Sequence, residues 1–360
     1  TMIRIVKTKE KSRREQMLLR LAAFVLALCA GGLFLLVLGN NPFAVYGTIL
    51  SGAFRSKMAV QATIKIMIPL LIAALGVTLA FKMKFWNIGG EGQLIMGGVF
   101  ASYFALFHAD WPSFVLFPVM LLAGIIGGGL WALIPAFFKV RFGTNETLFT
   151  LMLNYIALYL VSWLQEDPWR DPGANGFPKI ASFDKSATLP KLFGVQIGWV
   201  IALVLVAVLF VYLKYTKQGY EISVVGESRA TATYAGMNVP RIILRTMFLS
   251  GAIAGIAGMV QAIGSDRTLT TGIAGGVGFT AIIVAWLAQL NPVNSLVIAF
   301  LFAVLEKGSS VIQSQFGLST DCADVLQGII LFFVLGCEFF IRYKFVRDQK
   351  PAAAPQGGNT

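Results

Sequence analysis

The chain has 360 residues, of which 57% are hydrophobic and 13% are charged, and its formal net charge is +12. A soluble globular domain is nearer half apolar and a quarter charged, so this composition excludes that class and indicates an integral membrane protein. The positive charge does not indicate a nucleic-acid partner, because the basic residues gather at the ends of apolar stretches and no motif interleaves them with aromatic residues.

Both ends of the chain are basic. Residues 1–17 precede the first apolar stretch, and residues 342–360 follow the last and finish in a Pro-, Ala- and Gly-rich tail that we expect to be disordered. Lys and Arg concentrate on the cytoplasmic side of membrane proteins, so both termini are predicted to be cytoplasmic. The run 18–38 is about as long as a full span and has no clear cleavage site, so we interpret it as a retained span and not as a signal peptide.

Residues 18–341 form a transmembrane domain with about ten apolar stretches, where a full span takes about 20 residues. The stretches are residues 18–38, 60–81, 93–107, 114–138, 148–164, 197–213, 242–263, 277–290, 292–312 and 325–341. With both termini inside, the block formed by the second to fifth spans begins and ends outside. The block formed by the seventh to tenth spans begins and ends inside. Two four-span blocks of opposite orientation are typical of an inverted repeat. We therefore predict an all-α integral membrane fold with such a repeat.

Small residues recur four positions apart in two of these spans. Gly124 and Gly128 lie in the fourth span, and Gly251 and Gly255 lie in the seventh. This spacing places each pair on one helix face, where it lets helix backbones approach closely. We interpret these glycines as packing positions and not as ligand positions.

The run Asn87-Ile-Gly-Gly-Glu-Gly-Gln93 interrupts the apolar pattern before the short third span. Three glycines disfavour a helix here, and non-helical backbone at membrane depth survives only where protein or a wet cavity satisfies it. A charge at Glu91 is costly in lipid, so this side chain faces protein or a solute route, or else lies at a helix N-terminus on the inner surface. The helix-terminus interpretation is slightly favoured for Glu91, and the cavity interpretation is favoured for Asn87 and Gln93.

Two long polar segments separate other spans. Residues 165–196 form an outer loop rich in Pro, Gly, Trp and charge, which is either a solvated connector or a docking surface. Residues 214–241 form an inner loop in which Gly226 precedes a helix-compatible run, 227–235, and Gly236 follows as a stop signal. A two-turn helix is not stable alone in water, so it is either an interfacial helix or a lever gripped by a cytoplasmic partner.

Motifs in these segments resemble the ABC-importer permeases of the family that moves simple sugars, nucleosides and branched-chain amino acids. The inner loop matches at Thr216, Gly219, Tyr220, Val225, Gly226, Ala230 and residues 234–237, and it departs from the pattern at Ser223, Ser228 and Thr231. The run 87–93 is unbroken, and residues 143–147, 154–155, 168–172 and 177–178 are similar to the branch that moves nucleosides. The resemblance covers nearly the whole chain and is greatest to the larger permease of a bacterial nucleoside importer.

The resemblance implies a type II importer-like permease in the inner membrane of a bacterium, surrounded by lipid. It implies three partners: an ABC ATPase, a second related permease that makes a heterodimer, and an extracytoplasmic solute-binding protein that docks on the outer loop. The residues expected at the ATPase are Gly226, Glu227, Arg229, Ala230, Thr231, Tyr234, Ala235 and Gly236.

Polar side chains near the spans are candidates for the solute route of such a permease. Amides both donate and accept hydrogen bonds, which suits a ribose or a base edge. The candidates are Asn87, Glu91, Gln93, Asn145, Glu146 and Asn154. Helix capping by Asn87 and Asn145 is the alternative interpretation.

Signatures of catalysis and of metal binding are absent from the sequence. It has no Walker loop, so ATP hydrolysis is assigned to a partner, and it has a single histidine, His108, and no His-Glu-x-x-His motif. We therefore predict no catalytic residue, no cofactor and no metal. The alternative function is an ion-coupled secondary transporter, which would need buried charges to bind the ion. Its candidate residues are Glu91, Glu146, Glu306 and Glu338.

Overall fold

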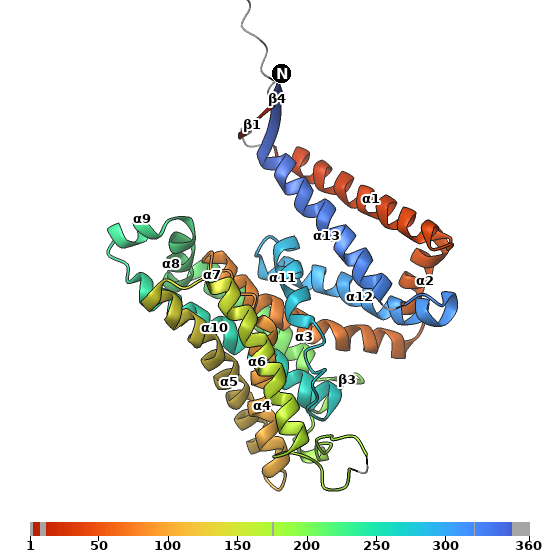
Figure 1. Ribbon diagram of the computed structural model, residues 1–360, viewed down its shortest axis with the longest axis vertical. Helices are drawn as coiled ribbons and strands as arrows, with labels where there is room; N and C mark the ends of the chain where they lie inside the picture. The colour runs from red at the N-terminus through yellow and green to blue at the C-terminus, as the bar shows by residue number, and fades with distance from the viewer. Residues whose placement is uncertain (1–2, 8–11, 175, 320, 348–360) are drawn as a thin grey trace, which may run out of the picture. The chain divides into compact units, whose positions relative to one another are not determined.

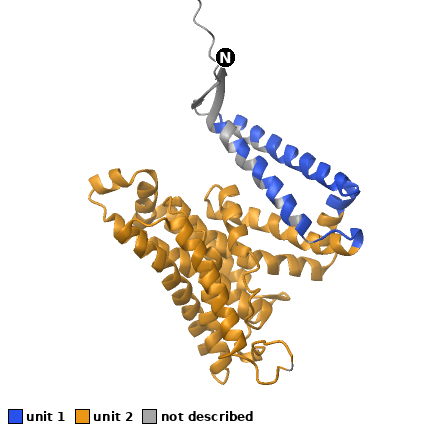
Figure 2. Cartoon of the chain, viewed as in Figure 1, with its two compact units in different colours: residues 1–47, 315–360 blue, residues 48–314 orange. Residues whose placement is uncertain are grey.

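The computed structural model describes residues 3–7, 12–174, 176–319 and 321–347, and these residues are almost entirely helical (Figure 1). The end of the predicted disordered tail lies outside the described residues. The chain divides into two compact units, residues 1–47 with 315–360 and residues 48–314 (Figure 2). Each unit is described by itself below.

The first unit pairs the beginning of the chain with its end. Helix α1 (Arg13–Val37) packs against α13 (Asp321–Arg342), and strand β1 (Ile3–Lys7) pairs antiparallel with β4 (Tyr343–Arg347). A capping box begins α1, because Ser12 Oγ accepts from the Glu15 backbone N–H and the Glu15 carboxylate accepts from that of Ser12. The two basic segments flanking the spans thus form a short β-ladder where the sequence predicted a basic terminus and a tail.

The second unit contains the remaining helices. Helix α2 (Pro42–Phe54) begins in the first unit and ends in this one. The others are α3 (Lys57–Lys82), α4 (Gly90–Phe107), α5 (Ser113–Phe142), α6 (Glu146–Glu166), α7 (Gly198–Tyr215), α8 (Lys217–Glu227), α9 (Arg229–Tyr234), α10 (Val239–Met259), α11 (Val277–Leu287) and α12 (Pro292–Phe316). A π-helical segment, η2 (Val260–Asp266), continues α10, while the outer loop holds one 3₁₀ turn (Lys185–Ala187) and the short strands β2 (Lys191–Leu192) and β3 (Val195–Gln196).

Each of the ten predicted spans overlaps a helix. Among the described residues, six helices are long and apolar enough to cross a membrane, namely α3, α5, α6, α7, α10 with η2, and α12, and α1 with α2 form a pair bent by 110° that passes the same test only when taken together. The all-helical membrane fold is confirmed. The count of ten spans and the inverted repeat stay predictions.

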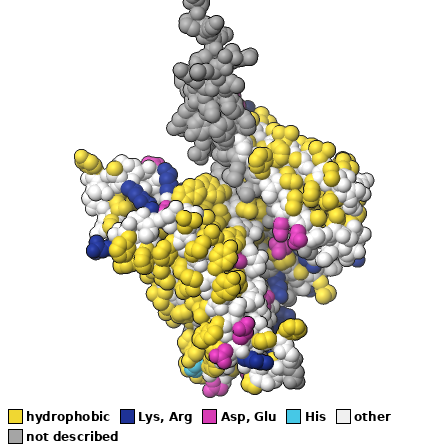
Figure 3. Space-filling view, in the orientation of Figure 1, with side chains coloured by type: hydrophobic (Ala, Val, Ile, Leu, Met, Phe, Trp, Pro, Cys, Tyr) yellow, Lys and Arg dark blue, Asp and Glu magenta, His cyan; other side chains and the backbone are white. Residues whose placement is uncertain are grey.

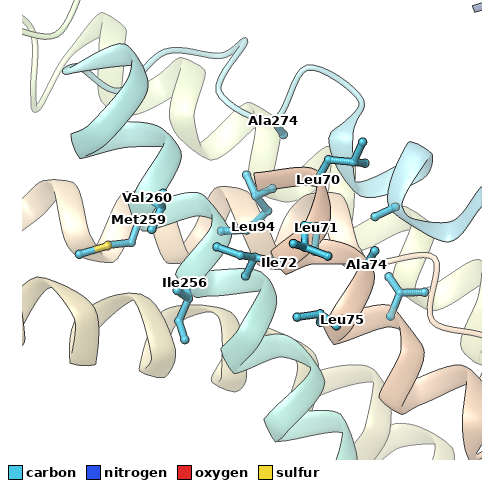
Figure 4. Close-up of a cluster of buried hydrophobic side chains, with 14 of the residues drawn as sticks. Leu70, Leu71, Ile72, Ala74, Leu75, Leu94, Ile256, Met259, Val260 and Ala274 are labelled. Carbon is cyan, nitrogen blue, oxygen red and sulfur yellow. The ribbon is translucent and has the colours of Figure 1, made fainter. Parts of the chain in front are cut away.

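Helices α3 and α10 lie at the centre of the second unit. In their apolar stretches 83% and 72% of the residues are buried, against 39% or less in α5, α6 and α7. Leu71, Ile72 and Leu75 of α3 belong to the same buried cluster as Leu94 of α4 and Ile256 of α10 (Figure 4). The central helices are the second and seventh spans, which occupy equivalent positions in the two predicted blocks.

Glycines bring α10 against α5 and α4, as their spacing predicts. A methyl group on Gly255 would overlap the carbonyl oxygen of Gly124, and one on Gly128 would overlap that of Gly251. On α4, Gly97 approaches the backbone of Gly255 in the same way. These backbones touch over several turns, so the three helices form a tightly packed layer.

Candidate functional site

The segment between α3 and α4 leaves the helical conformation and is held by an amide pair. The Asn87 side-chain amide donates to Gln93 Oε1 (3.1 Å), and the Gln93 amide donates back to Asn87 Oδ1 (3.0 Å). Asn87 Oδ1 also accepts from the Gly89 backbone N–H (3.0 Å). Asn87 and Gln93 are 0% and 1% exposed, so their hydrogen bonds are made within the protein.

Asn154 fastens this segment to α6. Its Oδ1 accepts from the Gly92 backbone N–H (2.8 Å), and its amide donates to the Ile88 carbonyl (2.9 Å). One turn earlier on α6, Thr150 Oγ1 accepts from the Ile88 N–H (3.2 Å). Thr150 was not among the sequence candidates, although its spacing of four from Asn154 puts both on one helix face. Together they satisfy backbone groups that would otherwise be unpaired in the membrane interior.

Glu91 joins two parts of the chain that are far apart in sequence. It lies in the first turn of α4, and its carboxylate accepts from the backbone N–H groups of Gly276 (2.8 Å) and Gly278 (2.6 Å). Those groups lie at the beginning of α11, which has no side-chain cap of its own. The negative charge therefore satisfies orphan donors at the positive end of that helix.

The segment before α11 is also irregular. Residues 267–276 are not helical, and Thr270, Thr271 and Gly272 are exposed. This segment follows the seventh predicted span, and residues 83–89 follow the second, so both predicted blocks have a break at the same position. Two broken helices that begin at equivalent positions are the arrangement that transporters use around a solute site.

Asn145 and Glu146 do not join this network. Asn145 caps α6, where its Oδ1 accepts from the backbone N–H groups of Thr147 (3.0 Å) and Leu148 (3.2 Å). Glu146 pairs with Lys139 Nζ (2.6 Å) across the turn between α5 and α6. Four of the six candidates therefore meet around 87–93, and two stabilise the start of α6. A part in a solute route stays a prediction for all six.

The inner loop contains two helices: α9 (Arg229–Tyr234) lies within the predicted run 227–235, whereas α8 (Lys217–Glu227) was not predicted. Helix α8 continues through Gly226 and ends at Glu227. Ser228 then adopts an extended conformation, and its Oγ accepts from the Thr231 N–H (3.2 Å), which begins α9 at Arg229. A serine in this position is a strong helix start, and the expected family pattern has asparagine there.

The glycines at the two ends of this region differ in role. Gly226 is buried against the end of α3, where a methyl group would overlap the Lys82 carbonyl oxygen, so it is a packing residue and not a hinge. Gly236 has φ of +74° and follows the end of α9, as predicted. The Met237 N–H closes that end by donating to the Ala232 carbonyl (3.0 Å).

Helix α9 is held on one side and free on the other. Ala232 is buried, whereas Ala230 and Tyr234 are exposed one turn apart, with Tyr234 at 96%. Arg245 of α10 binds Glu221 of α8 (3.0 Å), which anchors the pair of helices to the membrane part. No local pattern in the sequence indicates this ion pair, because its partners are 24 positions apart.

The outer loop has an ordered fold. Gln165 donates to the Pro178 carbonyl (2.8 Å), and Ser113 at the start of α5 donates to the Ser186 carbonyl (2.9 Å). Ser186 in turn donates to the Ala109 carbonyl (2.7 Å) in the turn between α4 and α5. The loop is therefore attached to the outer ends of these helices, and its Phe177 side chain is 94% exposed.

An apolar cavity of about 780 Å³ lies between α3, α7 and α12. Met67, Leu71, Leu203 and Phe300 are among its lining residues, and the lining amide of Gln61 donates to the Phe193 carbonyl (2.9 Å). A polar solute would lose its hydrogen bonds to water there without replacement, so this cavity does not suit one.

A double-mutant cycle on Asn87 and Gln93 tests the amide pair. Either Asn87→Ala or Gln93→Ala leaves the other buried amide unpaired, which should destabilise the chain by about 1–3 kcal/mol. The double variant should cost less than the sum, because it removes both amides. Thermal denaturation of the purified permease in detergent measures this, and additive losses would contradict the pairing.

The substitution Glu91→Gln tests the bridge between α4 and α11. The amide side chain would keep one acceptor oxygen but would present an N–H₂ group to a backbone N–H, so we expect loss of stability of about 2–3 kcal/mol and loss of transport. Glu166→Gln is the matched control, because Glu166 is exposed at the end of α6. Equal behaviour of the two variants in denaturation and uptake would contradict the bridging role.

The chain was compared with known proteins. Residues 62–335 match the family model described as branched-chain amino acid transport system, permease component. The chain is similar to the glucose ABC transporter permease of Haloferax volcanii, at 32% identity over 88% of this chain and 87% of that protein. It is similar to the guanosine permease of Bacillus subtilis (31%; 95% and 99%) and the nucleoside permease of Lactococcus lactis (28%; 90% and 92%). These matches agree with the apolar helices of the fold and with the breaks before α4 and α11. The chain therefore belongs to this permease family and is a membrane subunit of an ABC importer.

Proposed function

We propose that the chain forms, with a second and related permease, the route by which an ATP-driven importer moves a nucleoside or a related simple sugar inward. The observation that carries the proposal is the bridge from Glu91 to the start of α11. It joins two short helices that begin at breaks in equivalent positions of two apolar blocks, which is where transporters of this kind hold solutes. The printed substrates of the relatives, glucose, guanosine and nucleosides, support the solute class.

The part of Asn87, Gln93 and Asn154 in this route is to shape it. Their amides hold the segment before α4 in place, so the break in the helix is rigid and its position is reproducible. Asn145 and Glu146 likewise hold the inner end of α6 in place, by a helix cap and by an ion pair with Lys139. A solute would then meet the surfaces that these groups hold and not the amides themselves, which are already paired.

Coupling to ATP hydrolysis is assigned to the inner loop. An exposed aromatic side chain beside a small residue is typical of a contact that a partner fills, and Tyr234 and Ala230 offer this on α9. Glu227, Arg229, Thr231, Ala235 and Gly236 complete the stretch proposed for the ABC ATPase, and the buried Gly226 supports it from the side of α3. Lys and Arg are concentrated at the termini and in the inner loop. Because such residues favour the cytoplasmic side of a membrane, we place both termini and the inner loop in the cytoplasm of a bacterium.

The outer loop is proposed to receive the solute-binding protein. Its attachments to α4, α5 and α6 give it the defined shape that a docking surface needs, and the exposed Phe177 offers an anchor. The second permease would supply the other half of the route, as a heterodimer partner within the lipid bilayer.

An ion-coupled secondary transporter is the second candidate function, and the contacts of the described carboxylates argue against it. An ion site needs carboxylate oxygens that are free to bind the ion. Both oxygens of Glu91 accept backbone N–H groups, and Glu146 binds Lys139. Glu306 is exposed on α12, and the side chain of Glu338 lies outside the described residues.

Uptake by the reconstituted importer tests the proposed function. The chain is purified with its ATPase and second permease, placed in vesicles, and supplied with the binding protein and labelled guanosine or glucose. We expect accumulation that requires ATP in the ATPase compartment and that continues when proton and sodium gradients are dissipated. Accumulation that follows an ion gradient and ignores ATP would establish the secondary transporter instead.

Substitutions in α9 test the coupling surface. Tyr234→Ala should remove an interface anchor and weaken ATPase binding by about 2 kcal/mol, so solute-stimulated ATP hydrolysis and uptake should fall together. Ala230→Glu should act in the same direction by steric hindrance and desolvation. The matched control is Tyr220→Ala, which removes an exposed tyrosine from α8 (63% exposed). Normal stimulation in a fully assembled Tyr234→Ala complex would rule out this surface.

A further inference from the structure

Helix α6 carries a line of exposed aromatic side chains on the face opposite its hydrogen-bonded residues. Tyr155, Tyr159 and Trp163 are 51%, 68% and 55% exposed and are spaced four residues apart. The helix is about 31 Å long at 1.5 Å per residue. Tyr155 and Tyr159 therefore lie roughly 14 and 20 Å from its start, near the middle of a bilayer's hydrocarbon core.

The hydroxyl groups of these tyrosines have no partner within the described chain. No hydrogen bond joins the hydroxyl of Tyr155 or Tyr159 to another described residue, although Asn154 next to Tyr155 makes two. Hydrocarbon offers a hydroxyl no hydrogen bond, so a phenol in mid-membrane is costly unless water, solute or protein faces it. At Tyr155 and Tyr159 the helix therefore faces water, a solute or protein, although the exposed Met152 and Ile156 on the same side are aliphatic.

The neighbouring helices show what a lipid-facing surface of this chain looks like. On α5 the exposed side chains near the middle are Leu122, Ile126 and Leu130, and on α7 they are aliphatic as well, such as Val204 and Val208. In Figure 3, hydrophobic side chains are spread over α5 and α6, and tyrosine is coloured as one of them. Only on α6 does that surface include phenol groups at mid-length among these three helices.

A second group of aromatic rings lies beside the outer loop. Beyond Trp163, the ring of Trp169 in the outer loop lies 6.3 Å from Tyr103 and 5.9 Å from Phe107 on α4, measured between ring centroids. Tyr103 and Phe107 are themselves 45% and 53% exposed. Exposed aromatic rings thus lie both beside the outer loop and at the middle of α6.

We propose that Tyr155 and Tyr159 line the solute route and stack against the flat base of a permeating nucleoside, with their hydroxyls hydrogen-bonding to its polar edge. This inference rests on the proposed importer function and specifies the solute class. Stacking on an aromatic ring suits any base because every base has a π-face, and successive rings along a groove let a base move between equivalent positions. Tyr155 and Tyr159 are one helical turn apart and so provide two such stacking positions.

Cysteine substitution in the complete importer tests whether this face is wet and occupied. Cys29, Cys322 and Cys337 are the three native cysteines and are first replaced by Ala. Tyr155→Cys and Tyr159→Cys are then compared with Val208→Cys, an equally exposed position on α7. A charged, water-soluble thiol reagent attacks the thiolate, which forms in water and not in lipid.

We expect Tyr159→Cys to react about tenfold faster than Val208→Cys, because its thiol can ionise. Guanosine should slow the reaction, and glucose at the same concentration should not. Reaction no faster than at Val208 would overturn the proposal, and crosslinking of the two tyrosine positions to the second permease would then identify a dry subunit interface. Equal protection by glucose would overturn the assignment to nucleosides.

Uptake provides an independent measurement. Tyr159→Phe keeps the ring and should retain most guanosine uptake, whereas the double change of Tyr155 and Tyr159 to Leu should raise the KM for guanosine several-fold. Unchanged KM in an assembled Leu variant would refute the stacking role. Failure of the proposed function can be distinguished from failure of this inference. In the first case the wild-type importer would accumulate neither guanosine nor glucose with ATP. The labelling rates would still report whether water reaches the α6 face.

Discussion

The contact on which the structure of the membrane part depends is the carboxylate of Glu91 on the first turn of α11. Helix α11 begins after Gly276, whose φ of +82° turns the chain without providing a side-chain cap. Without Glu91, the backbone N–H groups of Gly276 and Gly278 would lose this acceptor inside a membrane, where an unpaired group is costly. Because Glu91 belongs to α4, the same contact sets the positions of two broken helices. The Asn87–Gln93 pair and Asn154 then fasten α4 to its own entry segment and to α6.

Contacts at the inner side connect α9 to the centre of the second unit. Gly226 of α8 lies against the carbonyl end of α3, and Glu221 of α8 binds Arg245 of α10. Among the six helices long and apolar enough to cross a membrane, α3 and α10 are the most deeply buried. A displacement of α8 would therefore reach both central helices at once, and the glycine contacts of α10 with α4 and α5 would carry it further as a rigid layer.

Much of this architecture was predictable from local patterns, and the rest depended on contacts distant in sequence. Apolar runs located the helices, the glycines of 87–93 located a break, and glycines four apart located the close packing of α5 and α10. The partner of Glu91 lies 185 positions away and leaves no local trace. The division of the inner loop at Ser228 had a local signal, a capping serine, which the pattern of the surrounding glycines obscured. Which face of α6 is exposed follows only from packing, so Tyr155 and Tyr159 were not recognised from the sequence.

The length of α5 has a consequence for the lipid around the protein. Its 30 residues extend about 45 Å, well beyond the roughly 30 Å hydrocarbon core of a typical bilayer. A helix this long must tilt, thicken the bilayer locally, or hold its ends in the headgroup region, where the exposed Arg141 in its last turn can reach the phosphates. Such hydrophobic mismatch makes acyl-chain length a variable that acts on α5, and α5 shares its glycine face with α10. Bilayer thickness thus acts mechanically on the most tightly packed layer of the permease.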